Sequence, residues 1–90
     1  MTLDSKVIIP DTLFLQKVDE ETILLDTVSQ EYFSLNEVGS VIWEILSDKK
    51  ELTLVKDEIL ARYEIDESQV ENDILKFVEA LAEKKLITID

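Results

Sequence analysis

The sequence predicts an α+β fold of the winged helix-turn-helix type, in which a three-stranded antiparallel sheet is followed by three helices. The main observation is a change of period at Asn36. Apolar residues alternate in short runs before it, as in strands, and recur at helical spacing after it. The chain has 90 residues, a hydrophobic fraction of 46% and one glycine and one proline, which is typical of a small globular domain. Strands grouped before helices are typical of the α+β class.

The first part of the chain predicts an arm and a strand meander. Residues 1–11 show no period, so we expect a flexible arm there and a single domain over residues 12–90. Alternating apolar residues predict strands at 12–18, 22–28 and 32–35. The three-residue polar turns between these strands are too short for parallel crossovers, so the pairing must be antiparallel.

The second part of the chain predicts three helices, near 37–47, 54–63 and 67–85, and a short terminal strand at 86–89. Asn36, Thr53 and Asp66 stand where each helix begins, and Asn, Thr and Asp are favoured helix caps. Gln69 follows Asp66 at capping-box spacing. Only residues 64–66 separate the second and third helices, which is the spacing of a helix-turn-helix.

Composition excludes several classes of site. The chain has no cysteine and no histidine, so disulfides, thiolate metal sites and histidine-based catalysis are excluded. Its 21 acids and nine bases give a net charge of -12, which disfavours binding to nucleic acid and to anionic membranes. We therefore expect no enzymatic activity, cofactor or metal. With no signal-like or membrane-spanning run, we expect a cytoplasmic protein.

The stretch Tyr32-Phe33-Ser34-Leu35-Asn36-Glu37-Val38-Gly39-Ser40-Val41-Ile42-Trp43 is the most informative. It resembles the PqqD family, whose members read aromatic–x–Leu-Asn–x–x–Gly–x–x–Ile-Trp after a strand hairpin. The resemblance covers about residues 12–89. The sequence departs from the family pattern at Lys85, where a glycine is usual, and in hairpin turns that lack the common glycines.

The resemblance implies a non-catalytic peptide-binding module, also called a RiPP recognition element. Such domains hold the leader segment of a ribosomally synthesised precursor peptide and present it to a modifying enzyme. The enzyme can be a radical SAM protein, a leader peptidase or a cyclase, in quinone-cofactor (PQQ), lasso-peptide or radical-SAM pathways. The leader is added as a strand beside the third strand and is covered by the third helix.

The residues themselves support the same interpretation. The third strand of a meander is an edge, and its segment Tyr32, Phe33, Ser34 and Leu35 contains no lysine, proline or bulge that would block strand addition. Three other occupants of this edge remain open: the 1–11 arm or the terminal segment can cover it, and a second copy can pair with it as a homodimer.

The third helix is the expected second wall of the binding site. Its apolar arc is wider than one core contact needs, and one border of the arc is expected to face the peptide. We favour the side of Asp73, Ile74 and Phe77, with Val70 in the same stripe. The carboxylate of Asp73 and its acidic neighbours would favour leaders that carry Lys or Arg.

Two residues in the motif carry structural expectations. Gly39 is the only glycine, and its place in the first turn of a helix predicts close approach by another backbone. Trp43 is expected to anchor the core.

A winged-helix DNA-binding or transcription-regulatory domain is the alternative by fold. The third helix would then be the recognition helix. Between residues 66 and 79 it carries five acids and one base, Lys76, whereas a DNA reader needs Arg or Lys there. The charge pattern therefore favours the peptide-binding interpretation.

Overall fold

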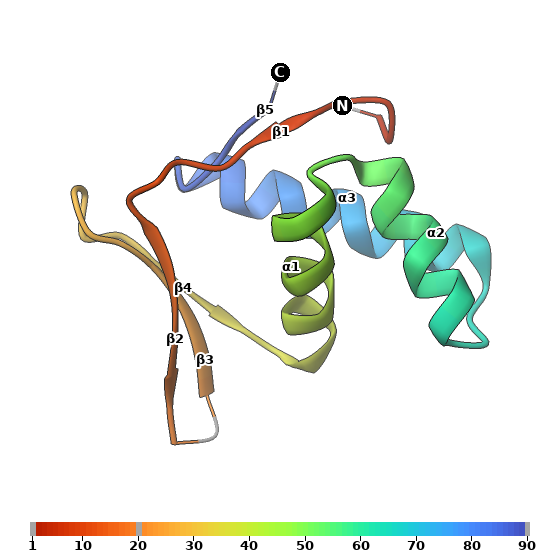
Figure 1. Ribbon diagram of the computed structural model, residues 1–90, viewed down its shortest axis with the longest axis horizontal. Coiled ribbons are helices and arrows are strands. Elements are labelled where there is room, and N and C mark those ends of the chain that lie inside the picture. Colours follow the sequence, from red (N-terminus) through yellow and green to blue (C-terminus); the bar gives the residue numbers. More distant parts are fainter. Residues whose placement is uncertain (1, 20, 90) are drawn as a thin grey trace.

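The computed structural model describes residues 2–19 and 21–89 and has the predicted order of strands and helices (Figure 1). The strands are β1 (Val7–Ile8), β2 (Leu13–Val18), β3 (Glu21–Asp26), β4 (Tyr32–Leu35) and β5 (Thr88–Ile89). The helices are α1 (Glu37–Lys49), α2 (Leu52–Arg62) and α3 (Glu67–Glu83). The turn expected at 19–21 includes residue 20, which, like residues 1 and 90, lies outside the described residues.

The predicted three-stranded antiparallel sheet is confirmed, with strand order β2-β3-β4. Residues directly opposite each other share a face of the sheet. Leu24 lies opposite Phe33, and Thr22 lies opposite Leu35. Leu24 and Leu35 are buried, which identifies this face as the one turned toward the helices. The other face carries the row Phe14–Leu25–Tyr32 across all three strands.

The N-terminal arm is more ordered than its lack of period predicts. β1 pairs with β5 in a separate two-stranded antiparallel sheet, and Lys6 forms an isolated bridge with Glu51. Val7 is only 4% exposed and belongs to the core. The sequence predicted no strand within residues 1–11, and β1 corrects that, while the division into a flexible arm and a domain at residue 11 stays a prediction. In Figure 1 both β1 and β5 lie at the top of the view, above the helices and away from β4.

The caps of α1 and α3 are as predicted. The Asn36 side chain accepts a hydrogen bond from the Gly39 N–H at 2.7 Å, and Asp66 accepts one from the Gln69 N–H at 3.3 Å. The cap expected at Thr53 is wrong, because α2 begins at Leu52, two residues before the predicted start, and Glu51 occupies the cap position without a side-chain hydrogen bond. Leu52 is fully buried, so packing rather than capping determines where α2 starts.

The end of α3 comes two residues before the predicted position. Lys85 adopts a left-handed backbone with φ 61°, which stops the helix after Glu83. This is the position at which the family pattern has glycine, the residue that adopts positive φ without a steric penalty. Lys85 therefore adopts the left-handed conformation that a glycine at this position would adopt without strain. Leu86 and Ile87, which follow, are buried.

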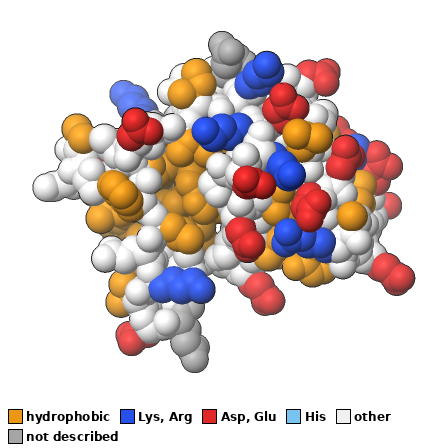
Figure 2. All heavy atoms as spheres, in the orientation of Figure 1, with side chains coloured by type: hydrophobic (Ala, Val, Ile, Leu, Met, Phe, Trp, Pro, Cys, Tyr) orange, Lys and Arg blue, Asp and Glu red, His pale blue; other side chains and the backbone are white. Residues whose placement is uncertain are grey.

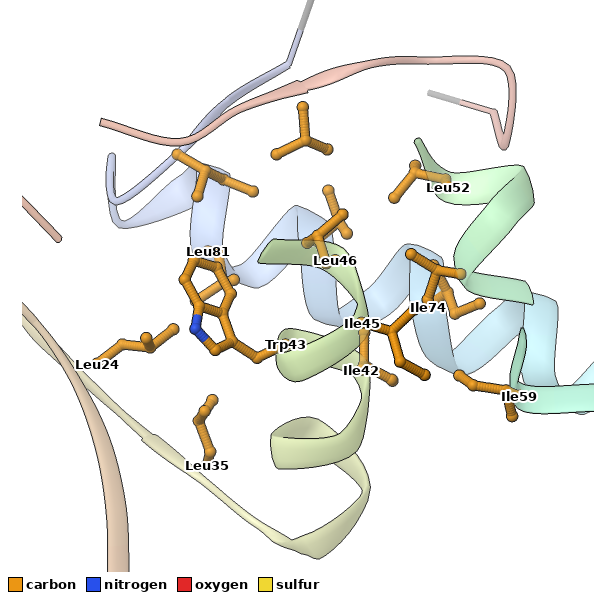
Figure 3. Close-up of a cluster of buried hydrophobic side chains, with 14 of the residues drawn as sticks. Leu24, Leu35, Ile42, Trp43, Ile45, Leu46, Leu52, Ile59, Ile74 and Leu81 are labelled. Carbon is orange, nitrogen blue, oxygen red and sulfur yellow. The ribbon is translucent and has the colours of Figure 1, made fainter. Parts of the chain in front are cut away.

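The core lies between the inner face of the sheet and the three helices. Trp43 is 6% exposed, as expected, and its ring points from α1 toward Leu24 and Leu35 on the sheet and Leu81 on α3 (Figure 3). This contact joins the sheet to the helices and fixes the position of β4 relative to α3. Over the described residues, no helix combines the length and apolar character that a membrane crossing requires.

Candidate peptide-binding groove

A groove lies between β4, the first turns of α1 and the middle of α3. Its volume is ≈ 620 Å³. The residues that line it are Phe33, Ser34, Leu35, Asn36, Val38, Gly39, Ile42, Asp73, Lys76, Phe77 and Ala80. Figure 2 shows apolar side chains gathered between the sheet and the helices, whereas acidic and basic side chains lie mostly over the helices. The groove thus combines an apolar floor with one strand edge.

The free edge of β4 forms one side of the groove. No other strand within residues 2–19 and 21–89 pairs with this edge, so neither β1 nor β5 covers it. The Asp26 N–H donates to the Glu31 carbonyl at 2.9 Å, on the β4 side, and the Thr27 N–H donates to the Thr12 carbonyl at 3.0 Å, on the β2 side. Successive residues of a strand direct their backbone groups to opposite edges.

This alternation assigns the backbone groups of β4. The backbone groups of Leu24 and Thr22 point toward β4, as those of Asp26 do. Phe33 and Leu35 lie opposite these two residues, so their N–H and C=O groups point back into the sheet. Tyr32 and Ser34 therefore present theirs at the free edge. An extended peptide that lies in the groove meets a ready set of backbone donors and acceptors there.

Two aromatic rings form the floor of the groove. Phe33 and Phe77 meet edge to face, with ring centroids 6.2 Å apart and an interplanar angle of 80°. The Lys84 ammonium lies 5.9 Å from the centroid of the Phe33 ring, within cation–π range. The floor connects β4 to α3, so a bound peptide would contact both elements at once.

The charges on the groove are mixed. Asp73 and Lys76 both line it, so the acidic wall expected from the sequence also carries a cation. Other acids of α3 have structural roles. Asp66 caps the helix, and Glu67 and Glu71 lie 2.6 and 3.5 Å from the Lys56 ammonium on α2. The hydrogen bond to Glu67 raises the pKa of Lys56, and the same bond lowers the pKa of Glu67.

The structure places the sequence-derived site residues in three groups. Phe33, Ser34, Leu35, Asp73 and Phe77 line the groove. Tyr32 contributes its backbone to the free edge, while its side chain lies on the outer face of the sheet and is 59% exposed.

Val70 and Ile74 form the third group and do not line the groove. They are 3% and 0% exposed and pack in the core. Their burial does not support a contact with the peptide, and such a contact stays a prediction. Both belong to the apolar stripe of α3 that faces the core, and the groove wall lies next to that stripe.

Lys76 and Ala80 on α3 line the groove and were not expected from the sequence. Residues 73, 76, 77 and 80 lie within about 100° of one another around a helix. The spacing of Lys76 and Ala80 from Asp73 and Phe77 is the sequence signal that places all four residues on one face. The apolar pattern does not reveal this face, because Lys76 and Ala80 interrupt it.

Gly39 shows a close approach of a different kind from the one expected. A Cβ atom there would lie 3.2 Å from Cε1 of the Phe77 ring and 3.2 Å from Oδ1 of Asn36. The expected neighbour was a backbone, and the actual neighbours are two side chains. The absence of a side chain at Gly39 leaves room for the ring that forms the groove floor.

Two solved structures are similar to this chain. One, "TbiB1 in Complex with the TbiA(beta) Leader Peptide", has 38% sequence identity and a TM-score of 0.76 over 89% of this chain and 93% of the other. The second, "Lasso peptide synthetase B1 complexed with the leader peptide", has 25% identity and a TM-score of 0.77 over 92% and 98% of the two chains. No curated protein sequence matches the chain.

A family profile described as coenzyme PQQ synthesis protein D (PqqD) matches residues 21–87. The match spans the hairpin β3–β4 and all three helices, so it includes every element that forms the groove. The Leu-Asn-x-x-Gly-x-x-Ile-Trp segment lies where β4 passes into α1, against Phe77 of α3. The chain belongs to the PqqD family.

Proposed function

We propose that this domain captures the leader segment of a ribosomally synthesised precursor peptide as an added strand on β4. The observation that carries the proposal is the uncovered edge of β4 beside a groove walled by α3. Strand addition supplies affinity through backbone pairing, and pockets for alternate side chains supply specificity. Both similar solved structures are complexes with leader peptides, which supports the same role here.

The partner that receives the peptide is proposed to be a maturation enzyme. One similar structure is named a lasso peptide synthetase, so a lasso-type pathway is the first candidate. The outer face of the sheet offers a docking surface, because Phe14 and Tyr32 are 56% and 59% exposed on either side of Leu25. Catalysis is assigned to that enzyme, and a cytoplasmic location stays a prediction. A homodimer, in which a second copy pairs with the free edge of β4, would appear as a concentration-dependent mass in ultracentrifugation.

The DNA-binding alternative gains no support from the site. Asp66 caps α3, Glu67 and Glu71 pair with Lys56, and Asp73 lines the groove. Carboxylates at these positions repel the phosphates of DNA. The similar solved structures are peptide complexes. We therefore do not retain DNA binding as a candidate function.

Proline substitution on β4 tests the strand-addition proposal. Ser34→Pro removes an N–H that faces the free edge, so the domain should fold and lose affinity for the TbiA(beta) leader peptide. Phe33→Pro removes an N–H that pairs with β3, so it should lower the melting temperature. Calorimetric titration and circular-dichroism melts measure the two effects.

Lys17→Pro on β2 is the matched control. Lys17 lies opposite Thr22, whose backbone groups point toward β4 and not toward β2. The Lys17 N–H therefore faces the other free edge of the same sheet. This variant should fold and keep its affinity for the peptide. Equal affinities of folded Ser34→Pro and Lys17→Pro would show that the peptide does not pair with β4.

A further inference from the structure

A second, smaller hollow lies between the start of α1, the end of α2 and the segment that leads into α3. Val41, Ile59, Tyr63 and Ile65 line it, and Glu37 is the one charged residue in the lining. Its volume is ≈ 180 Å³. Tyr63 and Ile65 are 45% and 42% exposed, so the structure leaves apolar surface open here.

This hollow adjoins the peptide groove. Val38 and Ile42 line both of them. Val38 is 54% exposed although it stands among the apolar residues of α1, and it forms the ridge between the two depressions. It follows Leu35 by three residues, so the hollow lies beyond the Leu35 end of β4 and not beyond the Tyr32 end.

The volume and the lining of the hollow indicate which kind of group it can bind. Sites for separate small molecules usually measure about 300–1,000 Å³, and this hollow is smaller than that range. Its lining favours an aliphatic or aromatic group. A strand on β4 is more stable per residue when it runs antiparallel, and an antiparallel peptide has its N-terminal flank at the Leu35 end.

We propose that this hollow binds one apolar side chain of the leader peptide, from the segment just before the residues that pair with β4. The inference rests on the proposed function, and it adds a specificity pocket that backbone pairing does not supply. The leader would be held at two places: as a strand in the groove and by one anchoring side chain beyond the Val38 ridge.

The test starts from random peptides displayed on phage and selected on the wild-type domain. Binders should share an apolar position on the N-terminal side of an alternating segment. Ile65→Lys, which introduces a charge into the hollow alone, should bind these peptides about tenfold more weakly, because burial of one apolar side chain is lost. Tyr63→Ala, which removes another wall, should act in the same direction.

Leu54→Lys is the matched control, because Leu54 is 41% exposed and lines neither depression. It should change affinity by less than about twofold, which is the range of surface substitutions away from contacts. Replacing the apolar residue of a selected peptide by alanine completes a double-mutant cycle. The alanine peptide should lose affinity for the wild type and not for Ile65→Lys.

The outcomes separate this inference from the proposed function. If Ser34→Pro loses the selected peptides while Ile65→Lys and Tyr63→Ala keep them, the pocket assignment is wrong and strand addition stands. If the hollow variants lose them while Ser34→Pro keeps them, the hollow is not an extension of the groove and both proposals fail. Failure of the selection to enrich any binder would contradict both as well.

Discussion

Gly39 and Phe77 form the contact on which the groove depends at the scale of single residues. The missing side chain of Gly39 admits the Phe77 ring, which in turn meets Phe33 on β4. The Gly39 N–H is also the donor to the Asn36 cap. One residue without a side chain therefore serves the start of α1 and the floor of the groove together.

Gly39→Leu tests this contact. A branched side chain must displace the Phe77 ring or the Asn36 cap, and such overpacking costs about 1–3 kcal/mol. We expect a lower free energy of unfolding in urea and weaker peptide binding, because the displaced ring enters the groove. An unchanged unfolding midpoint would show that the space beside Gly39 adapts freely.

The role of a residue can be predicted from the sequence when it depends on the side chain itself and its immediate neighbours in the chain. Asn36 and Asp66 cap helices through their own side chains, and the large apolar ring of Trp43 is buried. The sequence does not distinguish core from groove at Val70 and Ile74, because both kinds of position favour an apolar residue. Only the rotation of α3 about its axis, which is set by packing with the rest of the domain, distinguishes them.

The β3–β4 hairpin is the element that positions the binding edge. The Asp26 carboxylate accepts hydrogen bonds from the Val28 N–H at 2.9 Å and the Ser29 N–H at 3.3 Å, which holds the turn. The bond from Val28 lowers the pKa of Asp26, and the bond from Ser29 acts in the same direction. The ionised carboxylate therefore supports the turn from which β4 starts.

The stability of the domain should depend on this carboxylate in acid. Because folding lowers the pKa of Asp26 below its ordinary value of 3.8, its contribution to stability is complete well above that value and is lost progressively as the pH falls through the folded-state pKa. Asp26→Asn should be less stable than the wild type at neutral pH. The difference between them should shrink between about pH 5 and about pH 3.

Urea unfolding at each pH measures this difference, and Asp11→Asn serves as the control, since the Asp11 side chain is exposed. A constant difference between Asp26→Asn and the wild type across the range would mean that the turn does not depend on the charge.

Most elements could be predicted from the sequence, and β1 could not. Alternating and helical spacing identified β2, β3, β4 and the three helices to within a few residues, and the strand expected at 86–89 corresponds to β5. β1 has two residues, which is too short to show a period, and it exists because β5 lies beside it. The end of α3 was misplaced because a lysine rarely adopts the left-handed conformation that Lys85 has.

The whole molecule divides its surface between charge and apolar contact. The net charge is -12, yet the groove lining is mostly apolar and Figure 2 shows charged side chains mostly over the helices. A chain of this charge attracts basic peptides from a distance, and the attraction weakens with salt. In the proposed strand addition, apolar contacts and the β4 backbone then hold the peptide. The acidic surface would thus speed the encounter with a basic peptide, and the apolar groove with the β4 edge would slow its dissociation.

Amide hydrogen exchange by NMR, with and without the TbiA(beta) leader peptide, tests strand addition on β4 most directly. The account predicts that the amides of Tyr32 and Ser34, which face the free edge, become protected when the peptide binds. Phe33 and Leu35 should be protected in both states, and Lys17 on the opposite edge should not change. Peptide binding that leaves the Tyr32 and Ser34 amides as exposed as before would contradict the account.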